Sequence, residues 1–397
     1  MSDVAAITLN LNKTEFLQQD WQQRPRLFRA AFADFEDLVE AEILAGLACE
    51  EAVDSRIIEN HQGNWNVVHG PFEAYDAFGE SGWTLLVQSV NEWIPEVQQL
   101  IAPFRFLPDW RIDDVMISFA TEGGGVGPHL DQYDVFIIQG QGRRHWRVGE
   151  RVVGAEEHCP HPDLKQLAQP FTAVIDVVLE PGDMLYIPAG CPHEGIALEP
   201  SLNYSVGFRA QNSAELTTAV CDHLLNSSAK LVRYRDPHSD DYGTPYQVSQ
   251  SRLDHLREFA LSQLTQLDWD SALMAVLSTS KRPLPQPEAA PSEEELQFCF
   301  ANQEPLLLCR TPGARILLGP DGHCYSNGEQ LALTDANRPF AEYLAGQWQD
   351  LELAELTTTS NLDWQHPAAL QLLSELIQMG VFYLVDASDE DTDEQHA

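Results

Sequence analysis

The sequence lacks three patterns that define common protein classes. Its seven cysteines are odd in number, widely spaced and never arranged as C-x-x-C, which excludes a disulfide framework and a zinc ribbon. No run of about 18 apolar residues occurs, so no membrane-spanning helix is expected. The N-terminus has no cationic start followed by an apolar stretch, so we expect no signal peptide. Together these absences predict reduced thiols and a cytoplasmic location.

Basic residues are also scarce. The 397-residue chain carries 61 acidic side chains against 23 lysines and arginines, a formal net charge of −38. Such an acidic surface disfavours binding to phosphate backbones and to anionic membranes, so we expect no direct DNA binding and no membrane association. It favours a basic partner, or it is simply a well-solvated surface.

What the chain does contain is ample apolar material, at 44% of its residues. Its length favours two or three domains. Residues 1–110 mix polar segments with helix-like ones, and apolar positions follow helical spacing over 35–48 and 82–101. From about residue 111 the chain consists of short β-branched and aromatic runs separated by Gly, Pro and Asp turns. This pattern predicts a mainly β core, an antiparallel sandwich or jelly roll, with added helices.

Two amphipathic helices are expected after the β core. The first begins near Ser213 and the second runs from Arg252 to about Leu267. Their apolar faces consist of Leu216, Val220 and Leu224 in the first helix, and of Leu253, Leu256, Ala260, Leu264 and Leu267 in the second. Such helices could cover the β core or pair with another subunit.

The chain is therefore expected to divide into five segments. These are a β-rich domain with N-terminal helical elements at 1–212, a helical region at 213–280, a Pro-rich linker at 281–295, a small α+β winged-helix-like domain at 296–386, and an acidic disordered tail at 387–397. The DNA-binding role usual for winged helices is disfavoured because basic residues are scarce.

The segment Gly127–Val148, GPHLDQYDVFIIQGQGRRHWRV, places a histidine and an aspartate two residues apart. On a strand, His129 and Asp131 would project from the same face. One imidazole and one carboxylate are two-thirds of the facial triad that holds non-haem Fe(II) and leaves three positions open. His-x-Asp alone is common by chance, so this site needs a third ligand.

A third ligand is available in LEPGDMLYIPAGCPHEG, residues 179–195. This stretch predicts a turn, a strand entering the core, and then His193 where a strand ends or a loop begins. In a jelly roll, residues far apart in sequence meet on adjacent strands. His193 could therefore join His129 and Asp131.

These stretches, with LNYSVGFRA at 202–210, make the chain resemble the JmjC-domain oxygenases of the double-stranded β-helix (cupin) superfamily. More narrowly, it resembles the bacterial ribosomal oxygenases, which hydroxylate an arginine side chain of a large-subunit ribosomal protein. The order of β core, dimerising helices and winged-helix-like domain matches too. The resemblance implies a homodimeric 2-oxoglutarate-dependent dioxygenase in which His129, Asp131 and His193 hold Fe(II) as the catalytic centre.

The second carboxylate of 2-oxoglutarate, buried in the barrel, needs a cation. An arginine can bind it through two parallel hydrogen bonds. Arg144 lies 15 residues after His129, about the spacing at which related JmjC enzymes place a basic residue for this role. On a strand, Arg144 shares a face with Trp146 and Val148, whereas Arg143 points the other way. We therefore predict that Arg144 faces the interior.

Further pocket residues are predicted from the same strands. Ser118 could donate to the same carboxylate, and Asn203 could contact the co-substrate. Ser205 and Tyr133 are candidates for the wall of the substrate pocket, since Tyr133 shares parity with Asp131.

Three acidic residues near the motif could receive a substrate guanidinium. They are Asp114, Asp134 and Glu194. The sequence does not rank them.

Other functions remain open. Within the family, a histidine hydroxylase or a lysine demethylase is the nearest alternative. A metal-binding cupin without oxygenase activity usually carries His-x-His and a glutamate, a pattern that this segment does not have. A non-catalytic ribosome- or chromatin-binding module is disfavoured by the intact ligand set. Substrate choice is set by loops and pocket shape.

Overall fold

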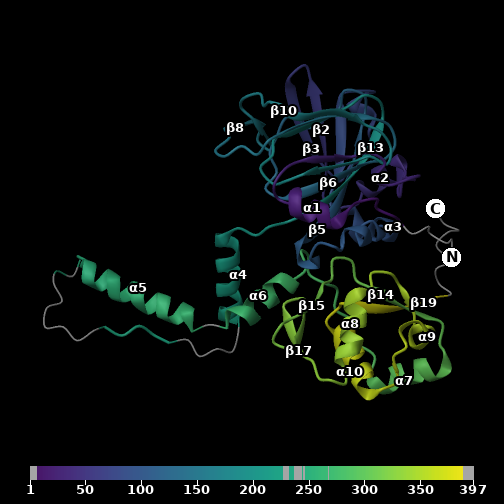
Figure 1. The fold of residues 1–397 in the computed structure, drawn as a ribbon, viewed down its shortest axis with the longest axis vertical. Helices are drawn as coiled ribbons and strands as arrows, with labels where there is room; N and C mark the ends of the chain where they lie inside the picture. The colour runs from purple at the N-terminus through teal and green to yellow at the C-terminus, as the bar shows by residue number, and fades with distance from the viewer. Residues whose placement is uncertain (1–6, 227–231, 237–243, 245, 267, 388–397) are drawn as a thin grey trace. The chain divides into compact units, whose positions relative to one another are not determined.

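The computed structural model of the chain describes residues 7–226, 232–236, 244, 246–266 and 268–387 (Figure 1). They fall into two compact units. The first comprises the described residues of 1–210, 281–313 and 346–397, and the second those of 211–280 and 314–345. None of the described helices is both long enough and apolar enough to cross a membrane.

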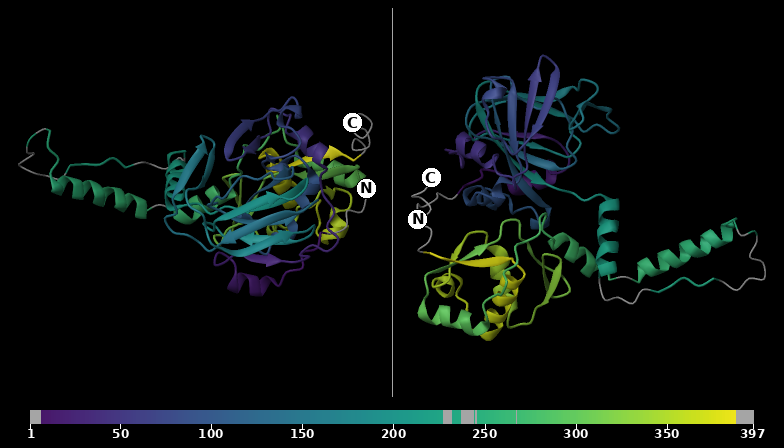
Figure 2. Two further views of the ribbon diagram at one scale, coloured as in Figure 1. Left: turned by 90° about the horizontal axis from the view of Figure 1, so that it is seen from above. Right: turned by 180° about the vertical axis from the view of Figure 1, so that it is seen from behind.

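The first unit is built on an eight-stranded antiparallel sheet. Its order is β1-β11-β6-β13-β5-β4-β2-β3. The strands are β1 (Arg26–Phe28), β11 (Met184–Ile187), β6 (Asp134–Gln139), β13 (Ser201–Phe208), β5 (Ile112–Ala120), β4 (Trp83–Val87), β2 (Ser55–His61) and β3 (Asn64–His69). Strand β1 thus pairs with β11, and β5 with β13, so segments far apart in the chain lie side by side in this sheet (Figure 1, Figure 2).

A smaller sheet and a hairpin complete the β core. The sheet has the order β10-β7-β12, with β10 (Ala173–Leu179), β7 (Arg144–Gly149) and β12 (His193–Ala197), and the hairpin pairs β8 (Glu157–His161) with β9 (Leu164–Leu167). Neighbouring strands in both sheets are antiparallel. The prediction of a jelly-roll core is therefore confirmed.

Strand alternation separates a packed face from a cavity face on the large sheet. On β6, Phe136 and Ile138 are fully buried in the main hydrophobic core. The neighbouring Val135 and Ile137 point to the opposite face, where they line a cavity. The same strand therefore stabilises the fold with one face and shapes a pocket with the other.

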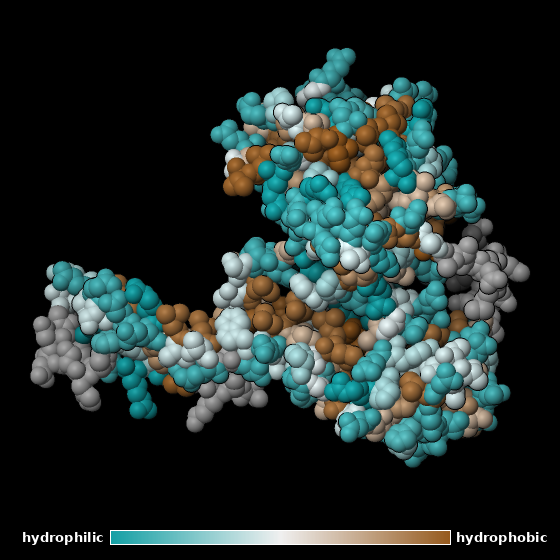
Figure 3. Space-filling model, viewed as in Figure 1, coloured by the Kyte–Doolittle hydropathy of each residue, from teal (hydrophilic) through white to brown (hydrophobic). Residues whose placement is uncertain are grey.

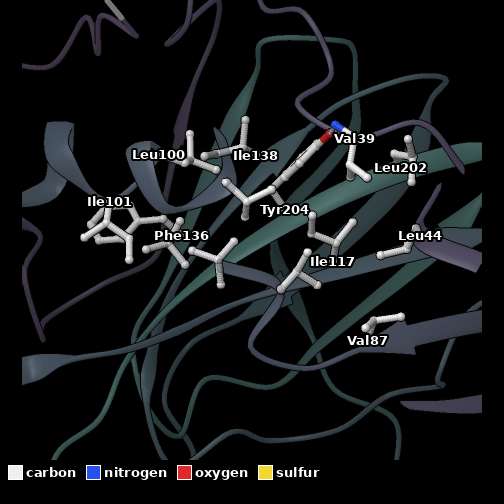
Figure 4. Packing of buried hydrophobic residues seen from close by; sticks show 14 of the residues in the cluster. Val39, Leu44, Val87, Leu100, Ile101, Ile117, Phe136, Ile138, Leu202 and Tyr204 are labelled. Atoms are coloured by element: carbon white, nitrogen blue, oxygen red, sulfur yellow. Dashed lines mark hydrogen bonds between the residues drawn. The ribbon is translucent and has the colours of Figure 1, made fainter. Parts of the chain in front are cut away.

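The main core lies behind that cavity. Its side chains include Ile117, Phe136, Ile138, Leu202 and Tyr204 (Figure 4). Figure 4 also shows the Tyr204 hydroxyl directed at the backbone of Val39, where the Val39 N–H donates a hydrogen bond to it at 3.4 Å. A buried phenol thus has its polar atom satisfied, as a packed interior requires.

The prediction of helices over 35–48 and 82–101 is mostly wrong. Only Ala41–Leu47 (α2) is helical within 35–48. Within 82–101 the chain forms strand β4, then η2 (Val90–Glu92) and α3 (Pro95–Gln99). All five residues of β4 are buried, so the run is apolar on both faces, and periodicity does not separate such a strand from a helix.

The other elements of the first unit are short. In the first 111 residues they are α1 (Lys13–Gln19), η1 (Asp76–Phe78), η3 (Ala102–Phe104) and η4 (Asp109–Arg111). After residue 281 they are α7 (Glu293–Asn302), β14 (Leu306–Arg310), β18 (Leu351–Glu352), α9 (Leu356–Ser360), α10 (Pro367–Gln378) and β19 (Phe382–Asp386). Strand β14 lies between β18 and β19 in a three-stranded sheet. A small α+β region follows the core, as predicted, while its winged-helix-like character stays a prediction.

The second unit contains the helices expected after the β core. They are α4 (Ser213–Asn226), α5 (Gln250–Thr265) and α6 (Trp269–Ser278), of which α6 was not predicted; β15 (Ile316–Leu318), β16 (His323–Ser326), β17 (Glu329–Ala332) and α8 (Arg338–Gly346) follow. Helix α5 begins earlier than expected because the Ser249 side chain caps it. Leu267 and, apart from Ala387, the expected acidic tail lie outside the described residues.

Phe136 provides a test of the core. Its ring centroid lies 4.8 Å from those of Phe104 and Tyr186. Replacing it by alanine removes these contacts and leaves a cavity, so we expect Phe136→Ala to lower the free energy of unfolding by about 3–5 kcal/mol. Phe298→Ala, at a side chain that is 61% exposed, should change it by less than about 0.5 kcal/mol. Urea denaturation followed by circular dichroism measures both; equal effects would contradict the assignment of Phe136 to the core.

Candidate metal centre

The backbones of His129 and His193 are joined directly. The N–H of each residue donates to the carbonyl of the other at 3.0 Å, forming an isolated antiparallel bridge. The two imidazole centroids are consequently 4.2 Å apart. This bridge brings together two histidines that are 64 residues apart in the chain.

Both rings are also fixed in one tautomer. The Nδ1 of His129 lies 2.9 Å from the carbonyl of Gly127, and the Nδ1 of His193 lies 3.0 Å from the carbonyl of Cys191. A carbonyl only accepts, so each Nδ1 carries a proton, and in the neutral ring Nε2 is the nitrogen that keeps the lone pair. Such second hydrogen bonds are the usual way in which proteins orient histidine ligands of a metal.

Asp131 completes the set. Its Oδ2 lies 3.4 Å from the Nε2 of His193 and 3.9 Å from the Nε2 of His129. The three ligand atoms lie within 4.8 Å of one another. Two imidazoles and one carboxylate on one side of a cavity fit an Fe(II) site that keeps three positions open.

The protonation states suit metal binding. Burial and the neighbouring His193 lower the pKa of His129 to about 4. Burial alone would raise the pKa of Asp131, but the hydrogen bond with His193 and the charges of both histidines lower it to about 2. At neutral pH, His129 is therefore neutral and Asp131 ionised, the forms that bind a metal.

The prediction that His129 and Asp131 lie on a regular strand is wrong. They belong to an irregular segment, and β6 begins only at Asp134. The Gly190 N–H donates to the Asp131 carbonyl at 2.8 Å. Isolated backbone hydrogen bonds between distant residues, and not a regular strand ladder, therefore orient the two side chains. His193 is the first residue of β12, close to the strand boundary expected for it.

A glycine in β12 allows the Trp146 ring to lie close to the strand that carries His193. Gly195 lies opposite Trp146 in the β12–β7 pair. A Cβ at Gly195 would lie 2.7 Å from the Trp146 ring, which is too close for any side chain. The indole can therefore cover the strand that begins with His193.

The three ligands line a cavity of about 270 Å³. Its apolar walls come from both sheets, and polar groups reach into it from both sheets as well. The lining includes Arg56, Ile58, Thr84, Leu86, Met116, Ser118, Val135, Ile137, Arg144, Trp146, Asn203 and Ser205. A pocket with apolar walls and convergent polar groups is typical of a small-molecule site.

Arg144 is placed inside this cavity and Arg143 outside it. Arg144 is 5% exposed, whereas Arg143 pairs with Glu199 at the surface. The Arg144 guanidinium donates to the side-chain and backbone oxygens of Ser118 and of Ser201, at 2.8 to 2.9 Å. Burial lowers the pKa of Arg144 to about 9, and no carboxylate of the described residues pairs with it. A buried cation with only neutral partners fits an anionic ligand.

Unpaired polar atoms on the cavity wall also indicate that a ligand binds in this cavity. Four buried atoms here form no hydrogen bond within the described part of the chain: Arg56 Nε, Thr84 Oγ1, Trp146 Nε1 and Asn203 Oδ1. Buried polar groups normally have partners, so a polar ligand would satisfy these atoms.

Several of these residues were missed from sequence. Thr84 comes from a segment expected to be helical, while Arg56 and Ser201 lie outside the motifs. A strand assignment for WTLLV would have pointed to Thr84. Asn203 and Ser205 do line the cavity, as does Tyr133. Burial raises the pKa of Tyr133 well above its ordinary value, and the nearby carboxylates add to the shift, so its hydroxyl stays protonated.

The structure separates the three acidic candidates for a guanidinium. Asp134 is fully buried and already bound by Arg111 and Tyr186. Glu194 lies on the outer face of β12, 3.7 Å from Arg147. Asp114 instead lines a second cavity of about 70 Å³, which shares Met116, Val135, Tyr133 and Ser205 with the first.

Comparison with known proteins shows what this chain is similar to. Residues 99–216 match the JmjC domain family. The chain is 44% identical to the ribosomal protein uL16 3-hydroxylase of Escherichia coli (strain K12), with 94% of this chain and 98% of that protein covered. It is 29% identical to the probable ribosomal oxygenase of Haemophilus influenzae, with 94% and 92% covered. The solved structure of YcfD, a ribosomal oxygenase from Escherichia coli, in complex with cobalt and 2-oxoglutarate, matches with a TM-score of 0.79 and 40% identity, covering 95% of this chain and 99% of that one.

The lowered pKa of His129 predicts a pH-dependent stability in the metal-free protein. Because its pKa is about 4 in the folded chain against 6.5 in the unfolded chain, the unfolded state binds more protons between these values. The contribution is thus present above pH 6.5 and lost as the pH falls through 4, up to about 3 kcal/mol. Denaturation of chelator-treated protein across this range should show a smaller loss for His129→Asn, while His61→Asn, at an exposed histidine, should keep it. An identical profile for His129→Asn would refute the assignment.

Proposed function

This chain belongs to the JmjC-domain ribosomal oxygenases, and on that basis we propose that it hydroxylates an arginine side chain of a large-subunit ribosomal protein, with Fe(II) and 2-oxoglutarate. The relative in Escherichia coli is named for hydroxylation of ribosomal protein uL16, so the corresponding protein is the first substrate to test. Ribosomal proteins are basic and are made in the cytoplasm, where we place the enzyme.

One observation carries this proposal. The cavity face of β5 presents Ser118, Met116 and Asp114 in succession. Ser118 lies beside the buried cation Arg144, and Asp114 is a buried carboxylate about 13 Å further along the strand. The metal ligands line the same cavity. A dianionic co-substrate and a cationic substrate therefore have separate ends of one site.

Different residues of the cavity would bind the metal, bind the co-substrate and exclude water. His129, Asp131 and His193 would hold Fe(II), which supplies O₂ activation and C–H oxidation when it is bound with 2-oxoglutarate. Arg144, held by Ser118 and Ser201, binds the far carboxylate of the co-substrate. Asn203 offers its free Oδ1 toward the same space. The apolar walls, including Ile58, Leu86 and Ile137, exclude water from the reacting groups.

The surroundings of Asp114 support the binding of a substrate guanidinium at this end of the site. Asp114 is 6% exposed, and Met116, Tyr133 and Ser205 surround the small cavity beside it. An alkyl stem would pack against Met116 and Tyr133 while the cation reaches the carboxylate. The net charge of −38 would also attract a basic protein over distance, an effect that weakens as the salt concentration rises.

A homodimer is the second part of the proposal. Helix α5 carries no buried side chain, and Leu253, Leu256 and Leu261 are between 42% and 54% exposed. Exposed apolar atoms are visible along this helix in Figure 3. An amphipathic helix normally covers its apolar stripe, and a second copy of the chain would do so.

The function is tested by incubating the enzyme with Fe(II), 2-oxoglutarate and uL16. We expect arginine to gain the mass of one oxygen atom, and His129→Ala to abolish the gain. Arg144→Met should raise the KM for 2-oxoglutarate roughly 10- to 100-fold, because a charge-assisted hydrogen-bonded pair contributes about 1.5–3 kcal/mol. Arg143→Met is the matched control and should leave it unchanged.

Three outcomes would contradict this assignment. Wild-type protein that turns over no 2-oxoglutarate would remove the oxygenase function. A mass gain on histidine, or loss of methyl groups from lysine, would favour the alternative activities. Equal KM values for Arg143→Met and Arg144→Met would remove the role of Arg144.

Dimer formation is tested by charge on α5. Leu253→Glu combined with Leu256→Glu would place carboxylates in an apolar interface, so we expect light scattering after gel filtration to show the mass of a single chain. Val153→Glu, at a 95% exposed apolar side chain, should leave the dimer intact. A monomeric wild-type protein would disprove the dimer.

A further inference from the structure

The Asp114 carboxylate is held by groups outside the cavity that it lines. Its Oδ2 accepts a hydrogen bond from the Ser89 hydroxyl at 2.8 Å and one from the Lys281 ammonium at 3.1 Å. The same ammonium lies 3.3 Å from Asp113. Lys281 is the residue at which the chain returns to the first unit after the helical region.

The two oxygens of Asp114 are used differently. Both described donors bind Oδ2. Oδ1 accepts no hydrogen bond from the described residues, and it faces Gly207, where an added Cβ would lie 3.6 Å away. Gly207 and Asp114 both line the small cavity. One oxygen is thus fixed by the protein, and the other is left for a ligand.

Lys281 stands behind the carboxylate, not in the place of a ligand. It does not contribute to the described lining of either cavity at this site. Burial alone would lower the pKa of its ammonium, but Asp114 and Asp113 raise it above the ordinary value. The ammonium is therefore charged at any pH at which the enzyme works.

The anchoring structure around Lys281 is extensive. Arg282 pairs with Glu92 at 3.3 Å, and the Val115 N–H donates to the Asn91 side chain at 2.7 Å. Residues 89–92 are therefore bound both to β5 and to the segment that begins at Lys281. Ser89 itself has a φ of 53°, a left-handed conformation that persists when surrounding contacts hold it.

We propose that Lys281 is a positioning residue for substrate recognition: with Ser89 it fixes Oδ2 of Asp114 so that Oδ1 faces the substrate cation. This rests on the proposed function, since it takes Asp114 as the receptor of the substrate guanidinium. Charge supports it as well. Asp113 and Asp114 carry two negative charges and Lys281 one positive charge, so the cluster presents one net charge to one guanidinium.

The test compares Lys281→Met with Lys281→Arg, with Arg143→Met, at a surface arginine paired with Glu199, as the control. The probe is an arginine-containing uL16 peptide that the wild-type enzyme hydroxylates. Lys281→Met should raise the peptide KM roughly five- to tenfold, with little change in kcat and no change in the KM for 2-oxoglutarate. It should also raise the succinate formed per hydroxylated peptide. Lys281→Arg should keep both values near those of the wild-type enzyme, and Arg143→Met should not alter them.

A second variant keeps the test valid if Lys281→Met fails to fold. Ser89→Ala removes the other hydrogen bond to Oδ2 and should raise the peptide KM in the same direction. An unchanged peptide KM in both variants would overturn the proposal. A lowered peptide KM in Lys281→Met would overturn it too, because Lys281 would then compete with the substrate.

Asp114→Asn separates this proposal from the function on which it rests. If wild-type enzyme hydroxylates the peptide and Asp114→Asn loses affinity for it, the substrate subsite stands and the Lys281 result decides the positioning role. If Asp114→Asn binds the peptide normally, the subsite itself is wrong and the positioning role falls with it.

Discussion

Two backbone hydrogen bonds between His129 and His193 are the constraint on which the site depends. They join a segment without regular structure to the start of a strand in the smaller sheet. Because each imidazole is then turned by a carbonyl of its own neighbourhood, the ligand geometry is set by main-chain atoms before any metal arrives. Such preorganisation spares the binding step the cost of ordering the ligands.

The cavity is arranged around charges that the protein alone does not balance. Arg144 has four hydrogen bonds and no described acidic partner, while Asp114 keeps one oxygen free. Leaving a buried charge without a counterion is unfavourable for the folded state. Here Arg144 lies beside Ser118 at one end of the cavity face of β5. At the other end, Asp113 and Asp114 with Lys281 leave one net negative charge, so one ligand of each sign stabilises the protein as it binds. Stability and recognition are thus coupled in the same few residues.

The sequence predicted the parts of the site that depend on local spacing. His129, Asp131 and His193 occur in short motifs, and alternation alone distinguished Arg144 from Arg143. It did not find Thr84 or Ser201, since their place at the cavity depends on which strands become neighbours. It did not separate Asp114 from Asp134 and Glu194 either, because that choice depends on which carboxylate lines the cavity once the strands have packed. The apolar run at 83–87 was mistaken for helix because both of its faces are covered.

The position of β13 has a consequence for how the chain is made. This strand lies between β5 and β6, yet it is synthesised after every other strand of the large sheet. Until Ser201–Phe208 has left the ribosome, β5 and β6 each present an unpaired edge, which is a template for pairing with other chains. The large sheet is therefore completed late, when β13 inserts between β5 and β6 at its middle. The cavity that the metal ligands line forms only after this insertion. A ribosome that stalls before this point would hold a nascent chain with neither a closed barrel nor a site.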